Sequence, residues 1–258
     1  MPVGTCARNN GARLASRPAK LLRVKGFGQR LAGAAGRLAC SVAACAALSL
    51  ATLAPAAAQG AGERRGAPPG QFDFYVLALS WSPGFCELNS SPARYDQCRS
   101  GSELGFVVHG LWPQYTQGFP TTCSATATQP TRAAIATTAG LYPDEGLARY
   151  QWRKHGTCSG LSPTDYFAAV RRARDAVVIP PAITAMQSAA TWTPLDLERA
   201  FAAANPGLRT DMMSVACRKG TLSEVRICFS KDLRSFQTCP ELDRQGCRGG
   251  SFTVPQPQ

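Results

Sequence analysis

The stretch that decides the fold is Phe72-Asp73-Phe74-Tyr75-Val76-Leu77-Ala78-Leu79-Ser80-Trp81. Beyond Asp73 both of its alternating faces are apolar, which is the pattern of a strand covered on two sides in the middle of a sheet. The turn residues Ser82-Pro83-Gly84 predict the end of this strand. The fold is therefore predicted to begin at Gln71, with a central strand.

A second strand is predicted from Leu104 to Leu111. Period-two alternation places Val107, His109 and Leu111 together on one of its faces. His109 would then project from a rigid element, which is how a catalytic side chain is held still. The segment 114–141 carries few long apolar side chains and is expected to mix loop with a short helix.

Three longer helices are predicted, over residues 144–155, 162–178 and 193–205. Asp144 can cap the first helix, which Gly156 terminates. The side chains on one face of that helix follow i, i+3, i+4, i+7, i+8 spacing and are Leu147, Tyr150, Gln151, Lys154 and His155. Beyond the helices, antiparallel strands are predicted at 212–217, 224–229 and 234–239, and residues 250–258 are expected to be disordered.

The first 58 residues have the pattern of a secretory signal. Eight Lys or Arg and no acidic residue precede an apolar run from Leu38 to Leu53. A membrane anchor is the alternative, but this run is shorter than the roughly 20 residues that a spanning helix needs. Residues 59–70 are expected to be a flexible segment and 71–249 one domain. Without the leader the formal net charge falls from +12 to +4, so charge alone does not distinguish a polyanion-binding surface from ordinary solubility.

Eight of the eleven cysteines lie beyond the leader. In an exported chain, secreted or periplasmic, this even number allows up to four disulfides. A local bridge between Cys86 and Cys98 would tie a polar loop to the first strand. Nested bridges, Cys228 with Cys239 and Cys217 with Cys247, would staple the C-terminal strands. A metal site is disfavoured because the chain has no Cys-x-x-Cys and two histidines in all.

Both histidines lie in short motifs rich in Trp and Gly, His109 in 106–113 and His155 in 150–158. Two imidazoles and a neighbouring Lys154 are what RNA cleavage by internal transesterification requires, namely a base, an acid and a phosphate-stabilising cation. The competing interpretation is a hydrogen-bonded core histidine and an exposed helix-terminal lysine. A serine hydrolase is excluded more firmly than this competing interpretation, because no Gly-x-Ser-x-Gly motif accompanies the histidines.

The two motifs, His-Gly-Leu-Trp-Pro and Trp-x-Lys-His-Gly-Thr-Cys, closely resemble the active-site segments of the ribonuclease T2 family. The segments 79–86 and 225–239 are also similar to that family. The resemblance implies an α+β fold, an antiparallel β-sheet flanked by helices with four disulfides, the remaining bridge joining Cys123 to Cys158. It also implies endonucleolytic cleavage of single-stranded RNA through a 2′,3′-cyclic phosphate, without a metal or other cofactor.

By position, the resemblance implies that His155 is the general base, His109 the general acid and Lys154 the cation. Trp112 corresponds to a base-stacking residue, and stacking suits single-stranded RNA. Trp81 and Trp152 are expected in the core. The expected partner is single-stranded RNA, with no cleavage of DNA, no membrane contact of the mature form, and a monomeric protein.

The chain departs from the family where Tyr150-Gln151 replaces a common His-Glu pair. Gln151 lies one turn from His155, and its amide can donate to a phosphate, so it remains a candidate catalytic residue. Tyr150 can offer a hydroxyl, and Tyr150, Gln114 and Trp112 are the candidate substrate-binding residues. Because Gln114 stands where some members have Asp, base preference does not transfer. The alternative function is a catalytically weak protein of the same fold that binds or stores RNA or acts as an interaction partner.

Overall fold

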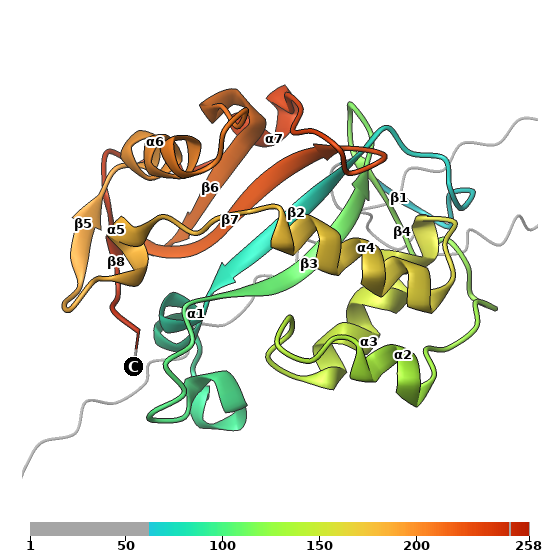
Figure 1. Cartoon of the computed structure of the whole chain (residues 1–258), viewed down its shortest axis with the longest axis horizontal. Helices are drawn as coiled ribbons and strands as arrows, with labels where there is room; N and C mark the ends of the chain where they lie inside the picture. The colour runs from blue at the N-terminus through green and yellow to red at the C-terminus, as the bar shows by residue number, and fades with distance from the viewer. Residues whose placement is uncertain (1–61, 248, 258) are drawn as a thin grey trace, which may run out of the picture. The chain divides into compact units, whose positions relative to one another are not determined.

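The computed structural model describes residues 62–247 and 249–257 (Figure 1). The predicted signal at 1–58 lies outside these residues. In the described part, six strands form one sheet along the path β3-β2-β7-β8-β5, with β6 also paired to β7. Their bounds are β2 Phe74–Trp81, β3 Phe106–Gln114, β5 Ala190–Trp192, β6 Met213–Arg218, β7 Thr221–Ser230 and β8 Phe252–Val254. The α+β architecture with a largely antiparallel sheet is confirmed.

Helices surround the sheet. Their bounds are α1 Ser82–Leu88, α2 Arg132–Ala136, α3 Glu145–Lys154, α4 Pro163–Asp175, α5 Pro181–Thr184, α6 Pro194–Ala204 and α7 Pro240–Arg244, with short 3-10 turns η1 Pro92–Arg94, η2 Asp96–Cys98, η3 Gly156–Cys158 and η4 Thr210–Met212. The three predicted longer helices correspond to α3, α4 and α6. Each has its expected cap, because Asp144, Ser162 and Thr193 accept backbone N–H groups through their side chains. None of the helices in the described residues combines the length and apolarity needed to cross a bilayer.

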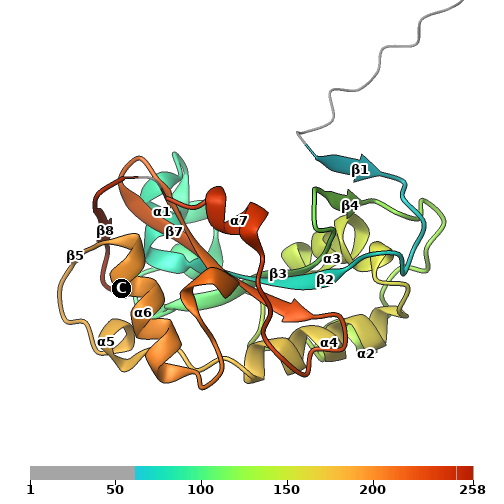
Figure 2. The same cartoon turned by 90° about the horizontal axis from the view of Figure 1, so that it is seen from above.

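The central strand β2 pairs antiparallel with β3 on one side and β7 on the other, and nearly all of it is buried as predicted. One face of the sheet carries Leu77, Leu79 and Ile227 into the main core with α4 and α6. Val76 and Cys228 on the opposite face pack with α7. Figure 2 shows α4 and α7 on opposite sides of the sheet. The face beneath α7 also carries the polar side chains of the site described below.

All four predicted disulfides are present: Cys86–Cys98, Cys123–Cys158, Cys217–Cys247 and Cys228–Cys239. The Cys123–Cys158 bridge ties the loop after β4 (Phe119–Thr121) to the end of the α3–η3 segment. Backbone hydrogen bonding reinforces that tie, because the amide of Thr122 donates to the carbonyl of Lys154 at 2.7 Å. The end of α3 is therefore fixed by a covalent bond and a hydrogen bond.

The prediction of a disordered end after residue 249 is wrong. Phe252 and Val254 are buried in β8, which pairs with β5 and touches β7 at Thr221. The indole N–H of Trp81 donates to the carbonyl of Pro255 at 2.9 Å. Composition suggested disorder because Pro and Gln are common there, but two apolar residues at strand spacing are enough to anchor the segment once a partner strand is available.

Two further expectations are corrected. The segment predicted to be flexible contains β1, Glu63–Arg65, which pairs in parallel with β4, and Gly70 donates its amide to Cys158 at 2.9 Å. The strand predicted at 234–239 is reduced to a single bridge between Phe229 and Phe236, followed by α7. The pairing of β1 with β4 joins segments that are distant in sequence, which local composition does not report. In the C-terminal segment, the backbone N–H of Cys239 donates to the distant carbonyl of Asp211 at 3.2 Å instead of continuing a ladder with β7.

Candidate active site

His109 lies at an irregularity in β3. Ala78 of β2 pairs with Gly110 and the next residue, Leu79, pairs with Val108, so His109 is an extra residue between them. A bulge of this kind changes which face the following side chains occupy. Trp112 therefore joins His109 on the face of the sheet that borders the cavity described below, whereas Leu111 is buried in the main core on the other face. The prediction that Leu111 shares a face with His109 is wrong, because simple alternation assumes an uninterrupted strand.

The helix α3 supplies the other motif. Gln151 is almost fully buried, His155 is 6 % exposed and Tyr150 is 44 % exposed. The predicted helix face therefore combines buried side chains with one that contacts solvent. Seven candidates from the sequence line one cavity of about 340 Å³, and they are His109, Trp112, Gln114, Tyr150, Gln151, Lys154 and His155. The structure thus brings together every predicted catalytic and substrate-binding residue.

Trp112 lies between the two imidazoles. Its ring stacks on His155 with 5.2 Å between centroids and an interplanar angle of 29°, and it meets His109 edge-on at 5.2 Å and 82°. The indole N–H donates to Oε1 of Gln151 at 2.9 Å. These contacts fix the spacing of the two histidines through one rigid aromatic side chain. Trp81 and Trp152 are buried in the core, as predicted.

Gly110 makes this arrangement possible. A Cβ atom at Gly110 would collide with Oε1 of Gln151 and Nε1 of Trp112, the two atoms joined by the hydrogen bond. Neither atom can move without breaking that bond or shifting the stack. The glycine in the first motif is therefore required by the close approach of α3 to β3.

A carboxylate that the sequence analysis missed completes the site. Oε1 of Glu224 on β7 lies 2.6 Å from Nδ1 of His109, and its Oε2 accepts from Nε of Arg226 at 2.5 Å. Burial alone would raise the pKa of Glu224, but the hydrogen bond from His109 and the charge of Arg226 hold this pKa below its usual value. The detectable signal was two charged residues, Glu224 and Arg226, that alternate with apolar residues in the buried part of β7 and therefore require buried partners.

The surroundings of His155 favour its neutral form. Burial, with smaller contributions from the nearby positive charges of Lys154 and His109, holds the pKa of His155 well below its usual value. Its Nδ1 and the Nε2 of Gln151 are buried without a hydrogen-bond partner in the described structure. Both residues line the cavity, although these two atoms themselves are shielded from solvent.

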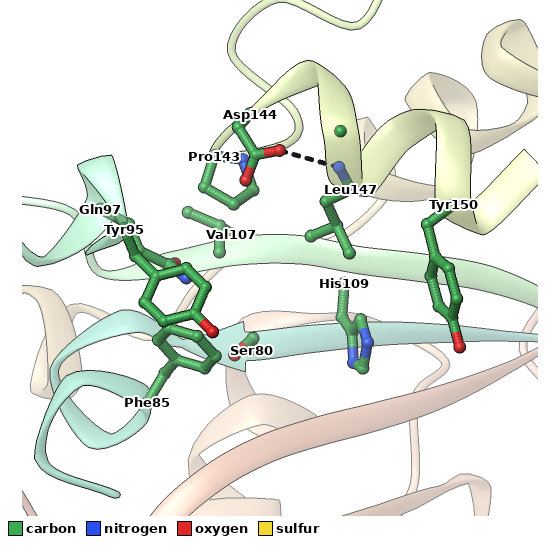
Figure 3. A pocket seen from close by; sticks show the side chains of 11 residues that line it. Ser80, Phe85, Tyr95, Gln97, Val107, His109, Pro143, Asp144, Leu147 and Tyr150 are labelled. Atoms are coloured by element: carbon green, nitrogen blue, oxygen red, sulfur yellow. Dashed lines mark hydrogen bonds between the residues drawn. The ribbon is translucent and has the colours of Figure 1, made fainter. Parts of the chain in front are cut away.

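A second cavity of about 360 Å³ is also lined by His109, and Trp112 is not among its lining residues (Figure 3). Phe85 and Tyr95 pack edge-to-face at one end with 4.9 Å between centroids. Leu147 and Tyr150 of α3 form another wall. Flat aromatic and apolar walls suit a nucleobase. This cavity was not predicted, because the Cys86–Cys98 loop that contributes Tyr95 carries no recognisable motif.

The arrangement is suited to proton transfer on either side of a bound anion. One imidazole is held by a carboxylate, the other is neutral and buried, and Lys154 and Arg226 line the same cavity. Among the described residues, no group of three or more His, Cys, Asp or Glu side chains is placed to hold a metal ion.

Comparisons with known proteins give one family. Residues 72–239 match the model of the Ribonuclease T2 family. The chain is 39% identical over 176 residues to a ribonuclease of Aeromonas hydrophila, covering 67% of this chain and 78% of that one. Among solved structures, an RNase-related protein from Calystegia sepium superposes with a TM-score of 0.57 at 22% identity, covering 72% of this chain and 98% of that one. RNase NT in complex with 5′-AMP gives 0.57 at 21% identity, covering 72% and 99%.

Proposed function

The chain belongs to the ribonuclease T2 family and is an endoribonuclease of that type, and we propose that it cleaves single-stranded RNA by transesterification through a 2′,3′-cyclic phosphate. The observation that supports this mechanism is the placement of two imidazoles in one cavity with Lys154. The ring centroids of His109 and His155 each lie 5.2 Å from the centroid of the Trp112 ring. No metal ion or other cofactor takes part.

In the proposed first step, neutral His155 takes the proton from the ribose 2′-hydroxyl, and the 2′-oxygen attacks phosphorus. The bond from phosphorus to the 5′-oxygen breaks, and this oxygen takes a proton from His109. Glu224 balances the positive charge of protonated His109 by accepting from its Nδ1. Lys154 stabilises the additional negative charge on the phosphoryl oxygens in the transition state. The two histidines exchange roles when water opens the cyclic phosphate.

Gln151 and Trp112 are proposed to position the substrate. Gln151 holds Trp112 through Oε1, and its Nε2 is a buried donor without a partner in the described structure. A small shift of the side chain on substrate binding lets this N–H donate to a phosphate oxygen. One cavity is lined by Trp112, Tyr150 and Gln114, and a base can stack in it. The aromatic cavity beside His109 can receive the next base. Base preference follows from neither cavity alone.

The direct experiment is an in-gel assay with yeast RNA across pH 4 to 8, using refolded mature protein. A cleared band is expected, and the double variant His109→Ala/His155→Ala should leave the RNA intact. No clearing by the unaltered protein at any pH would contradict the enzymatic function. It would favour the second candidate, an RNA-binding or storage protein of the same fold, which is motivated by Tyr150 and Gln151.

The pH dependence should be displaced toward acid. As the base, His155 must be neutral, and its lowered pKa keeps it neutral as pH falls below its ordinary value of roughly 6.5. Activity is therefore expected to persist through pH 6 and to fall only as pH passes through the lowered pKa. The acidic limb of kcat/KM against pH measures this, and a midpoint above 6.5 would be inconsistent with a neutral, buried base.

Gln151→Glu is expected to change kcat/KM by no more than about 10²-fold, the low end of a general acid–base effect. A carboxylate oxygen can still accept from the Trp112 indole, but the second oxygen replaces the Nε2 donor. Steady-state kinetics on a dinucleotide checks this, with Gln151→Leu as the control that removes the acceptor as well. A much larger loss in Gln151→Glu than in Gln151→Leu would mean that added negative charge, and not the lost donor, dominates.

We also propose that the mature protein begins after residue 58, is secreted or periplasmic, acts as a monomer and does not cut DNA. Four disulfides support an oxidising compartment. Cell fractionation with N-terminal sequencing tests the compartment and the cleavage site. Light scattering on the purified protein tests the monomer, and a mass of twice that of the mature chain would contradict it.

A further inference from the structure

We propose that Arg226 is a phosphate-binding residue of the RNA site and that Glu224 holds it there. This inference rests on the ribonuclease function proposed above. It adds to the site a residue of β7, outside both histidine motifs.

The sheet brings Arg226 to the site across two small residues. Arg226 pairs with Ala78, and Ala78 pairs with Gly110, so this row across the sheet holds only small residues between Arg226 and the far side of β3. The guanidinium can therefore extend over this row toward Trp112, and its Cζ lies 5.5 Å from the centroid of that ring. The side chain is 28% exposed, and it lines the same cavity as His109, Lys154 and His155.

The hydrogen bonding of Arg226 leaves donors free for a ligand. Its Nε donates to Oε2 of Glu224 at 2.5 Å, while Oε1 of Glu224 is engaged by His109. Within the described residues, the two terminal nitrogens of Arg226 have no hydrogen-bond acceptor in the protein. A guanidinium held through Nε presents these nitrogens in a fixed direction, and their geometry matches two oxygens of a phosphate.

Charge balance favours the same assignment. Besides the imidazoles, Lys154 and Arg226 are the positively charged side chains lining this cavity, and they come from different elements, α3 and β7. Glu224 is the nearby carboxylate, and its two oxygens are engaged by His109 and Arg226. A phosphate that gains a second negative charge during transesterification would therefore meet a cation from each element.

The competing role for Arg226 is purely structural, as the counter-charge of buried Glu224. Binding of a 2′-O-methyl oligoribonucleotide separates the two roles, because this probe retains the phosphates but cannot be cleaved. Arg226→Gln is expected to raise its Kd roughly 10- to 100-fold, the size of a lost charged hydrogen bond. The slope of log K against log salt should also become shallower by about 0.7, the value for one phosphate contact on a single strand.

The matched control is Arg199→Gln on α6, where an exposed arginine lies 3.8 Å from Asp196 and outside the cavity. It removes the same charge and should leave both quantities unchanged. An equal loss of affinity in Arg199→Gln would reduce the effect to net charge and overturn the proposal.

The Glu224→Gln background provides the decisive comparison. If Arg226 binds phosphate, adding Arg226→Gln to Glu224→Gln still weakens the probe and lowers the salt slope. If Arg226 only neutralises Glu224, the second substitution changes neither, and the inference fails. Should Arg226→Gln not fold, judged by circular dichroism, Arg226→Lys replaces it. Its ammonium lacks the planar fork that bonds Glu224 through Nε and presents two further nitrogens to phosphate, so unchanged affinity would count against the proposal. If the unaltered protein does not cleave RNA at all, the proposed function itself is rejected.

Discussion

Replacing either histidine by alanine is expected to lower kcat by about 10²- to 10⁴-fold, the range for removal of a general acid or base. The two losses should not be equal in kind, because the proposed roles differ. His155→Ala removes the neutral group that accepts the 2′-hydroxyl proton, whereas His109→Ala removes the donor that Glu224 holds through Nδ1.

A substrate with an activated leaving group distinguishes these roles. A 4-nitrophenyl ester of uridine 3′-phosphate releases its leaving group without protonation. We expect this ester to restore much of the activity of His109→Ala and little of that of His155→Ala. Restoration in the opposite variant would reverse the assignment of acid and base. Thermal unfolding provides the control, since a variant with an unchanged Tm has lost chemistry and not structure.

The second large effect concerns the substrate. An RNA strand that carries a single 2′-deoxyribose should resist cleavage at that nucleotide while every other linkage is cut, because the attacking oxygen is missing only there. Denaturing electrophoresis of an end-labelled strand reads this position by position. Cleavage after the deoxyribose, or degradation of a DNA strand of the same sequence, would contradict attack by the 2′-oxygen.

The same labelled strand tests the independence from metal ions. Addition of EDTA is expected to leave the cleavage pattern and rate unchanged, because the proposed charge stabilisation comes from Lys154 and Arg226. A loss of activity that Mg²⁺ or Zn²⁺ restores would require a different source of transition-state stabilisation.

The sequence was most informative where periodicity and caps act locally. The apolar run of β2 predicted a central strand, and Ser162 and Thr193 predicted the starts of α4 and α6 correctly. The disulfides could be paired because their cysteines lie in recognisable segments. These features depend on residues near one another in the chain or on motifs of known arrangement.

The features that escaped prediction depend on pairing between distant segments. The extra residue at His109 arises from the register of β3 on β2, and it places Trp112 beside His109 where regular alternation would separate them. Glu224 reaches His109 only because β7 lies on the other side of β2. The last strand, β8, likewise exists because β5 and β7 offer it partners.

The central claim is that cleavage passes through a 2′,3′-cyclic phosphate. Phosphorus NMR of a dinucleotide during digestion measures it most directly. We expect the resonance of the cyclic phosphate to appear as the phosphodiester disappears, and then to be converted slowly into a 3′-monophosphate. Direct formation of a 5′-monophosphate, with no cyclic species at any time, would contradict the roles assigned to His109 and His155.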